Sequence, residues 1–344
     1  MEIKECPYSN DKSVRRVVVT GGYGFIGSNL ILYLLKHRPN WEIINVDSLT
    51  YAANLSNLSE IEKNNQHHFI QVDIRNRAEL QQVFEKYKPD GIFHLAAESH
   101  VDNSINDPQQ FIESNIVGTF HLLEVCRQLW GDDSYHRFLH VSTDEVYGSL
   151  GAAGFFTEQS RYAPNSPYSA SKAGSDHLVR AWHRTYGMNA IITHSANNFG
   201  PRQHPEKLIP TVVHAALSHR PIPIYGDGSN VREWLYVEDH CSALLRVFEQ
   251  GVGGESYAIG ARNEWKNIDL VNMICTILDE NIGEGSNGSY SSLITFVPDR
   301  LGHDIRYAID PSKIEKDLKW QPTGQFQDKL AKTIMWFVHN MNRD

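Results

Sequence analysis

Residues 15–30 read RRVVVTGGYGFIGSNL, an apolar run followed by a glycine-rich turn and the start of a second apolar pattern. Gly22-x-Gly24-x-x-Gly27 matches the dinucleotide-binding pattern, and Gly21 extends it to a second form, GxxGxxG. The first glycines permit a tight turn, Gly24 lets the backbone approach a pyrophosphate, and Gly27 allows close packing of helix on strand. The stretch therefore predicts a strand, a phosphate-binding turn and a helix whose first N–H groups face the phosphates.

An acidic residue follows at the spacing that this pattern requires. Asp47 ends the next apolar run, WEIINVD, twenty residues after Gly27. A carboxylate there accepts hydrogen bonds from the adenosine ribose and repels a 2′-phosphate, and no arginine follows in SLTYAAN, so NAD is favoured over NADP. Asp73, which ends HHFIQVD, is a candidate for the adenine pocket, and an ordinary turn aspartate is an equally good interpretation.

The first half of the chain alternates two kinds of pattern. Strand-like runs occupy residues 15–21, 41–47, 67–73, 91–97, 136–143 and 189–195. Helical patterns occupy residues 25–38, 77–88, 111–130 and 168–187. This order predicts a parallel sheet covered by helices on both faces. Asp107-Pro108 and Ser166-Pro167 mark two helix starts, and Gly187 marks a helix end.

The rhythm loosens after about residue 200, where helical patterns at 206–220, 266–280 and 326–341 mix with short strands at 221–226 and 255–260. We therefore expect an α/β fold, a Rossmann-type doubly wound parallel sheet with a smaller mixed α/β substrate domain. Residues 14–200 would form mainly the NAD-binding domain, with residues 234–260 returning to it. Residues 201–233 and 261–344 would form mainly the second domain, and residues 1–13 a polar N-terminal extension.

Composition narrows the class of protein. The 344 residues are 41% hydrophobic and 21% charged, and the net charge of −9 argues against nucleic acid as the main partner. No apolar run reaches the length of a membrane span, and the N-terminus lacks the apolar segment of a signal peptide. Four widely spaced cysteines suggest a reducing cytoplasm, and the histidines show no metal-ligand spacing, so we expect no metal.

Tyr168 and Lys172, in YSASK, stand four residues apart and share a helix face. Lowering a phenol pKa from about 10 to neutrality takes ~4 kcal/mol. One positive charge at about 4 Å supplies up to ~4 kcal/mol in an effective dielectric of about 20, before desolvation subtracts. Such a pair is common on surface helices, but after a dinucleotide fold and the fifth strand it predicts a catalytic base.

Several motifs occur in order across both halves: TGGYGFIG, LAAESHVD, STDEVYG, YSASK, NNFGPRQHPEKLIP and DRLGHD. With them the chain, from about residue 14 to 340, resembles the extended short-chain dehydrogenases/reductases, and among these the dTDP-glucose 4,6-dehydratases. It departs from the usual pattern at Leu301, where proline is common, at Tyr23, where a small residue is common, and slightly within THSANNFGPRQ. None of these departures removes a proposed catalytic group.

The resemblance implies an NAD-dependent hydro-lyase that converts dTDP-glucose to dTDP-4-keto-6-deoxyglucose and water in deoxysugar (rhamnose-type) biosynthesis. Tyr168, held by Lys172, would remove the O4 proton during C4 oxidation, and Thr143 would hydrogen-bond the same oxygen. Glu145 would remove the C5 proton and Asp144 would protonate the departing C6 oxygen, before hydride returns to C6. Neighbouring carboxylates push their pKa values apart, which supports this division of labour.

The same resemblance assigns the residues that bind ligands. Those at the cofactor are Gly21, Gly24, Phe25, Ile26, Gly27, Asp47, Ser48, Leu49, Thr50, Asp73, Ile74, Leu95, Ala96, Ala97, Ser99, Ser114, Tyr168 and Lys172. Those at the nucleoside-diphosphate hexose are Ser99, Thr143, Asn197, Lys207, Leu208, Pro223, Tyr225, Arg232, Asn267, Arg300 and His303. A homodimer through the helices at 109–130 and 168–186 is also implied.

Three alternative functions remain open at this point. A dehydratase for a UDP- or GDP-linked hexose has the same groups. A nucleotide-sugar epimerase or decarboxylase shares the fold, but has no need of Asp144 and Glu145. A non-catalytic NAD-binding sensor would need neither these acids nor Tyr168 and Lys172.

Overall fold

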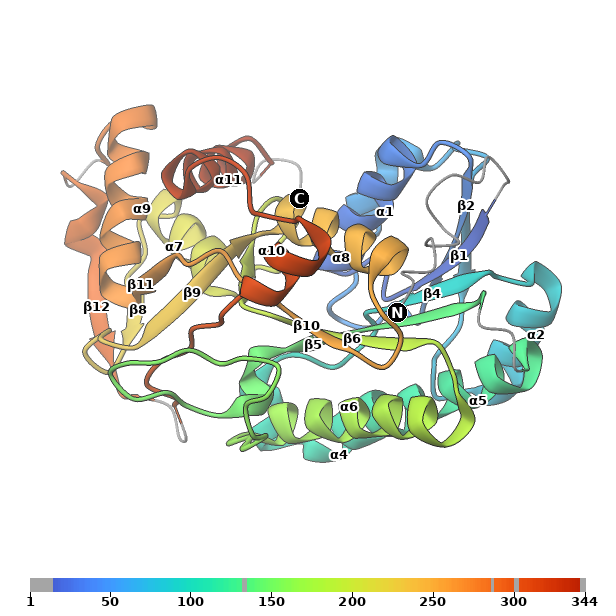
Figure 1. The fold of residues 1–344 in the computed structure, drawn as a ribbon. Coiled ribbons are helices and arrows are strands. Elements are labelled where there is room, and N and C mark those ends of the chain that lie inside the picture. Colours follow the sequence, from blue (N-terminus) through green and yellow to red (C-terminus); the bar gives the residue numbers. More distant parts are fainter. Residues whose placement is uncertain (1–14, 132–134, 286–287, 300–302, 341–344) are drawn as a thin grey trace.

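The computed structural model describes residues 15–131, 135–285, 288–299 and 303–340. The expected N-terminal extension at residues 1–13, Arg300 and Leu301 lie outside the described residues. Two lobes are visible in Figure 1, a larger one built on a long sheet and a smaller one that holds α7, α9 and α11.

A parallel sheet of seven strands forms the centre of the larger lobe, in the order β10-β6-β5-β4-β1-β2-β3. The strands are β1 (Arg15–Thr20), β2 (Trp41–Asp47), β3 (His67–Gln71), β4 (Gly91–His94), β5 (Arg137–Thr143), β6 (Ala190–Ser195) and β10 (Ser256–Ile259). The strand order reverses between β1 and β4, which is where ligands bind in doubly wound sheets. The predicted fold class is confirmed.

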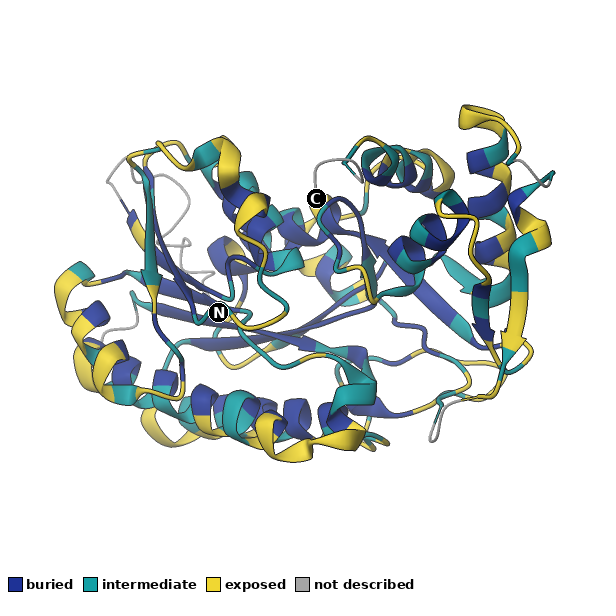
Figure 2. Cartoon of the chain, turned by 180° about the vertical axis from the view of Figure 1, so that it is seen from behind, coloured by how far each residue is buried: buried dark blue, intermediate teal, exposed yellow. Residues whose placement is uncertain are grey.

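Helices cover both faces of this sheet (Figure 1), and each face has its own apolar core. On one face lie α1 (Phe25–His37), α8 (Val237–Gln250) and α10 (Ser312–Leu318). On the other lie α2 (Arg77–Tyr87), α5 (Thr119–Trp130) and α6 (Pro167–Tyr186). The strands other than the edge strand β3 are mostly buried, as Figure 2 shows in dark blue, and burial on both sides explains their continuous Val/Ile runs.

The helix predicted at residues 111–130 forms without a break, but its first part is a π-helical segment. The chain forms α3 (Val101–Asn106) and α4 (Pro108–Phe111), then a π-helical turn η2 (Ile112–Gly118), and only then α5. Asp107 precedes Pro108 as expected, but its side chain makes no capping hydrogen bond, so that part of the prediction is wrong.

The ends of α6 agree with the sequence prediction. The Ser166 hydroxyl accepts from the Ser169 N–H, and the Ser169 hydroxyl accepts from the Ser166 N–H. Gly187 closes the helix with φ of 69°, a conformation that favours glycine. This reciprocal cap places the first turn of α6, with Tyr168, at the end of β5.

Among the described residues, the smaller lobe has two small sheets and three helices around a separate apolar core. Its strands are β7 (Asn197–Phe199), β8 (Ile222–Tyr225), β9 (Val231–Tyr236), β11 (Glu264–Lys266) and β12 (Ile294–Val297). Its helices are α7 (Leu208–Leu217), α9 (Asn267–Ile282) and α11 (Phe326–Asn340). Short turns complete the chain at η1 (Leu55–Ile61), η3 (Asp144–Tyr147) and η4 (Tyr290–Leu293).

The chain crosses between the lobes more than once. β10 joins the large sheet and α8 packs on α1, while β9 leads directly into α8. Within residues 261–344, expected mainly in the second domain, Ile309, Ile314 and Leu318 instead pack in the core of the large sheet. Among the described residues, no helix has the length and apolar character needed to cross a membrane.

The sequence analysis did not predict α8, and its packing gives a test of the fold. Phe248 of α8 is fully buried, and its ring stacks on Phe93 of β4 with centroids 4.3 Å apart. We expect Phe248→Ala to lower the free energy of unfolding by about 3–5 kcal/mol, measured by urea denaturation. Val252→Ala, at an exposed position just after α8, should change it by less than about 0.5 kcal/mol. Equal effects of the two variants would contradict this packing.

Candidate active site

A cleft of about 750 Å³ lies along the carboxyl ends of the large sheet and extends to residues of the smaller lobe. Its volume is in the range of small-molecule sites. Its walls come from the segments that follow β1, β2, β3, β4, β5 and β6, and from α6, α7, β8 and β9. The carboxyl ends of parallel strands meet at one edge, and this brings together residues that are distant in the sequence.

The glycine-rich turn forms one end of the cleft. Gly21 has φ of 72°, and its carbonyl accepts from the Gly24 N–H at 3.1 Å. A Cβ on Gly27 would lie 2.1 Å from the same carbonyl oxygen, so the turn admits only glycine there. No side chain caps the start of α1, so its first N–H groups point into the cleft without a capping partner.

Asp47 is fixed beside this turn. Its Oδ2 accepts from the Tyr23 N–H at 2.9 Å and its Oδ1 from the Leu49 N–H at 2.8 Å. Burial raises the pKa of this carboxyl, and the two backbone hydrogen bonds oppose the shift. Leu49 is not among the residues that line the cleft, and it supports Asp47 through its backbone.

The remaining residues predicted at the cofactor also line the cleft. They are Phe25, Ile26, Ser48, Thr50, Asp73, Ile74, Leu95, Ala96, Ala97, Ser99 and Ser114. Asp73 is engaged by Arg75, whose Nε and Nη2 approach its carboxylate at 3.0 and 2.7 Å. Burial raises the pKa of Asp73, but the hydrogen bonds from Arg75 outweigh it and the net shift is downward. This arrangement of turn, helix start and ribose-facing carboxylate fits a dinucleotide.

Tyr168 and Lys172 lie together near the middle of the cleft, on the first turns of α6. The Lys172 Nζ donates to the Val141 carbonyl oxygen at 2.8 Å, and burial lowers the pKa of this ammonium to about 8. The pKa of the Tyr168 phenol is raised, by burial and by the charges of Glu145 and Asp144, although a hydrogen bond with Thr143 opposes the shift. Burial is the largest of these effects, so desolvation dominates the pKa of Tyr168 in the described structure.

The two acids that follow β5 have different surroundings. Thr143 caps η3 by accepting from the Glu145 N–H at 3.3 Å, and its hydroxyl lies 3.4 Å from Asp144 Oδ1. Asp144 is 1% exposed, and its Oδ2 has no hydrogen-bond partner. Burial, Glu145 and Glu233 raise the pKa of Asp144 well above its ordinary value. Asp144 is thus a buried carboxyl whose pKa is raised, beside the partly exposed Glu145.

The far end of the cleft brings together most of the residues predicted at the nucleotide sugar. They are Asn197, Lys207, Leu208, Pro223, Tyr225, Arg232, Asn267 and His303. The Arg232 guanidinium lies 4.3 Å from the centre of the Tyr307 ring and donates to the Asp304 carbonyl oxygen at 2.9 Å. The Lys207 Nζ donates to the Ser99 carbonyl oxygen at 3.3 Å, which joins the two walls.

The sequence analysis missed several lining residues, among them Trp234, Gln203 and Tyr307. Four buried atoms in the cleft wall have no hydrogen-bond partner among the described residues: Trp234 Nε1, Gln203 Oε1, Asn197 Oδ1 and Asn267 Oδ1. Buried polar atoms without partners are rare, so this end is suited to a polar ligand. Trp234 follows Arg232 by two residues on β9, and strand alternation alone would have placed both on one face.

A sequence model described as GDP-mannose 4,6 dehydratase matches residues 18–333 of the chain. The chain belongs to the GDP-mannose 4,6 dehydratase family. Family members named dTDP-glucose 4,6-dehydratase are similar to it over nearly their whole length. That of Neisseria meningitidis is 52% identical and that of Escherichia coli 50%, with 94% or more of each chain covered.

Solved structures give the same result for the fold. A dTDP-glucose 4,6-dehydratase from Streptomyces venezuelae, solved with NAD bound, is 44% identical with a TM-score of 0.88, over 95% of this chain and 98% of that one. A UDP-glucose 4-epimerase from Thermotoga maritima is only 26% identical, with a TM-score of 0.83 over 95% and 99% of the two chains. The fold is thus shared with epimerases of the wider group, whereas the sequence is much closer to dehydratases.

The opposite surroundings of two buried carboxyls give a direct test of this site. Asp144 and Asp176 are both 1% exposed, but the pKa of Asp144 is raised and that of Asp176 is lowered. At pH 7 we expect Asp144→Asn to remove an infrared band of a protonated carboxyl, and Asp176→Asn to remove none. Loss of such a band in Asp176→Asn, or its persistence in Asp144→Asn, would contradict the assignment.

Proposed function

We propose that the chain is an NAD-dependent dTDP-glucose 4,6-dehydratase, which converts dTDP-glucose to dTDP-4-keto-6-deoxyglucose and water. One observation carries the chemistry: Asp144, a carboxyl whose pKa is raised by burial, stands beside a second acid, Glu145, and both line one cleft with Tyr168. Relatives that share half of the residues and nearly the full length bear this name.

The glycine-rich turn, the start of α1 and Asp47 would hold NAD. Bound NAD⁺ takes the C4 hydrogen of the hexose as hydride and later supplies it to C6. Tyr168 receives the O4 proton during the oxidation, and Thr143 orients the same oxygen. The phenol in the described structure has a raised pKa, so proton removal depends on Lys172 and on the positive charge that arrives with the cofactor.

Loss of water is assigned to the two acids. A ketone at C4 acidifies the C5 hydrogen, which Glu145 removes as a base. Asp144 gives its proton to the C6 oxygen, which then leaves as water, and its missing hydrogen-bond partner at Oδ2 suits this donation. When hydride reaches C6, a proton returns to C5, so the net change is the loss of one water.

Buried arginine and amides support the nucleotide end of this proposal. Arg232 offers a positive charge to a diphosphate, and Asn197 and Asn267 offer side-chain amides. Arg300, predicted here as well, lies outside the described residues. The preference for dTDP is supported by the names of the close relatives.

The reaction can be tested in heavy water with dTDP-, UDP-, GDP- and CDP-glucose, followed by mass spectrometry. We expect net loss of water with one solvent deuteron retained at carbon, fastest with dTDP-glucose. An epimerase would give an isomer of unchanged composition, and a protein that binds NAD without converting any sugar would be a sensor. Faster conversion of UDP- or GDP-glucose would overturn the dTDP preference.

The two acids can be separated from the oxidation step. Asp144→Asn and Glu145→Gln should each lower the rate of water loss by about 10²–10⁴-fold, the usual effect of removing a general acid or base. A C4 ketone should still form, and quenching with borodeuteride would report it as deuterium at C4. Glu85→Gln, on the exposed side of α2, is the matched control. If both active-site variants lost water at the wild-type rate, the assignment of Asp144 and Glu145 to the dehydration step would be wrong.

We also propose that the chain forms a homodimer through α5, α6 and η2, and that it works in the cytoplasm. Ile112, Val117, Leu129 and Tyr186 leave apolar side chains exposed on this face. Ile112→Glu should convert dimer to monomer in sedimentation, whereas Phe296→Glu, at an exposed apolar position on β12, should not. The cysteines at 126, 241 and 275 are buried and free, which suits a reducing compartment.

A further inference from the structure

Three charged or ionisable side chains share one face of α6. Tyr168, Lys172 and Asp176 follow one another at intervals of four residues, which places them in a row along the helix. Tyr168 and Lys172 both line the cleft. Asp176 is the third, and it lies deeper in the protein at 1% exposure, outside the cleft wall. The proposed reaction gives this residue no role.

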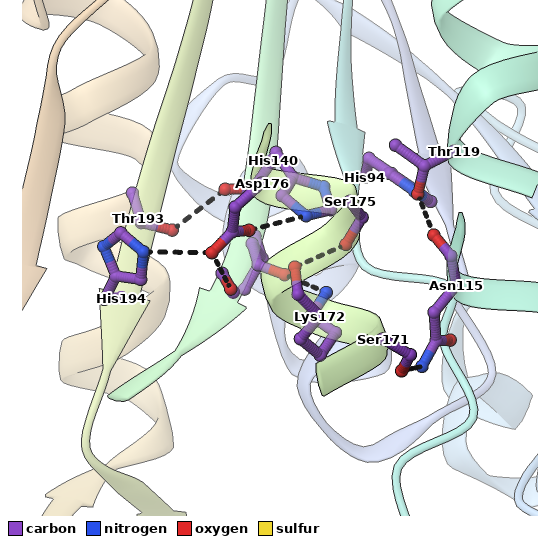
Figure 3. A network of polar contacts seen from close by, with 12 residues as sticks. His94, Asn115, Thr119, His140, Ser171, Lys172, Ser175, Asp176, Thr193 and His194 are labelled. Atoms are coloured by element: carbon purple, nitrogen blue, oxygen red, sulfur yellow. Dashed lines mark hydrogen bonds and ion pairs between the residues drawn. The ribbon is translucent and has the colours of Figure 1, made fainter. Parts of the chain in front are cut away.

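Asp176 is surrounded by hydrogen-bond donors from other elements, as Figure 3 shows in part. Its Oδ2 accepts from the Ser142 hydroxyl at 2.9 Å and from the Tyr162 hydroxyl at 3.0 Å. His194 Nε2 lies 3.2 Å from Oδ2, and His140 Nε2 lies 3.2 Å from Oδ1. Burial raises the pKa of Asp176, but these donors outweigh burial and hold the pKa well below its usual range. The carboxylate is therefore ionised.

Lys172 needs a countercharge more than most lysines do. The side chain is 4% exposed, and an ammonium in such a place loses most of its hydration. The Val141 carbonyl oxygen, 2.8 Å from Nζ, is a neutral acceptor and does not balance the charge. Burial lowers the pKa of Lys172 to about 8, and the charge of Asp176 opposes that shift.

Two histidines that face this region from neighbouring strands carry no positive charge that would compete with Lys172 for the Asp176 carboxylate. His94 of β4 lies between two hydroxyls, with Nδ1 2.8 Å from Thr20 Oγ1 and Nε2 2.9 Å from Thr119 Oγ1. Burial lowers the pKa of His94 well below its usual range and that of His140, on β5, to about 4. Both rings are therefore neutral at physiological pH.

The other ionisable groups around Lys172 and Asp176 can be placed as well. His194 of β6 lies with Nδ1 3.1 Å from the Tyr147 hydroxyl and Nε2 2.9 Å from the Tyr162 hydroxyl. Burial raises the pKa of both tyrosines, so both are neutral. Asp144 and Glu145 act on Tyr168 from the side of the cleft. Asp176 thus supplies a negative charge on the interior side of Lys172, and its hydrogen-bond donors stabilise that charge.

We propose that Asp176 is a positioning residue for the reaction, because its buried carboxylate keeps Lys172 an ammonium and thereby supports the loss of the Tyr168 proton. Asp176 touches neither substrate nor cofactor and acts through Lys172. The inference rests on the proposed function, since it assumes that Tyr168 accepts a proton during C4 oxidation.

The sign of the effect follows from the charge. Without a negative charge at position 176, Lys172 gives up its proton at a lower pH. A neutral lysine no longer stabilises a phenolate, so C4 oxidation fails as the pH rises. Replacing Asp176 by a neutral residue should therefore move the alkaline limb of the pH–rate profile to lower pH, and should change the rate little on the acidic side.

The test compares kcat/KM for water loss from dTDP-glucose between pH 6 and 9 in Asp176→Asn and the wild-type protein. We expect the loss in the variant to be at least tenfold larger at pH 8.5 than at pH 6.5. We also expect a larger kinetic isotope effect from C4-deuterated substrate at the higher pH. Asp176→Ser is measured in parallel, because the amide N–H groups of asparagine would face the donors around position 176 and could prevent folding. Serine introduces no such amide group.

Two further variants separate charge from structure. Asp176→Glu keeps the charge and should keep the alkaline limb of the wild type, even if it lowers thermal stability. Asp239→Asn removes another buried carboxylate, one held by Thr323 and Lys329 away from the cleft, and should leave the limb in place.

The outcomes are distinct. An alkaline limb that stays in place in both neutral variants, with equal loss at every pH or none, would overturn the role of Asp176 and leave it a structural residue. A wild-type protein that removes no water from any nucleotide sugar would instead overturn the proposed function.

Discussion

A charged group buried in a protein persists only where its neighbours stabilise the charge, and the contact between β5 and α6 applies this rule in two opposite ways. At the cleft end, Asp144 has an oxygen without a hydrogen-bond donor among the described residues, and burial raises the pKa of this carboxyl. At the interior end, Asp176 Oδ2 accepts from Ser142 and Tyr162, a histidine nitrogen lies 3.2 Å from each carboxylate oxygen, and the pKa of this carboxyl is held low. Tyr168 and Lys172 of α6 lie between these two carboxyls. The protonation of the phenol and of the ammonium therefore depends on both carboxyls.

The parallel sheet makes this arrangement possible. Each strand ends at the same edge, so residues from six strands reach one cleft. β5 is central because successive residues do different work: the Val141 carbonyl oxygen holds Lys172, Ser142 holds Asp176, and Thr143 begins the turn that carries the acids. The smaller lobe completes the cleft with Arg232 and the side-chain amides of Asn197 and Asn267.

Features that depend on one short stretch of sequence could be predicted. Features that depend on residues brought together by the fold could not. The glycine turn, Asp47 and the Tyr168/Lys172 pair each depend on a short stretch with a fixed spacing, and all of them line the cleft. Helix α8 was missed, although Cys241, Leu244 and Phe248 follow a helical period. The raised pKa of Tyr168 could not be predicted, because burial depends on the whole fold. The partners of Asp176 come from β5, β6 and the segment before α6, and no spacing in the sequence shows that they meet.

The two adjacent acids, Asp144 and Glu145, differ in burial because of the turn in which they lie. η3 is a 3-10 turn, in which neighbouring side chains point about 120° apart. One carboxyl consequently enters the protein while the next remains at the edge of the cavity, although a single peptide bond separates them. Under the proposed mechanism, the position of each acid in the turn therefore decides which one donates a proton and which one accepts a proton. A chain with these two residues in the opposite order would exchange the two roles.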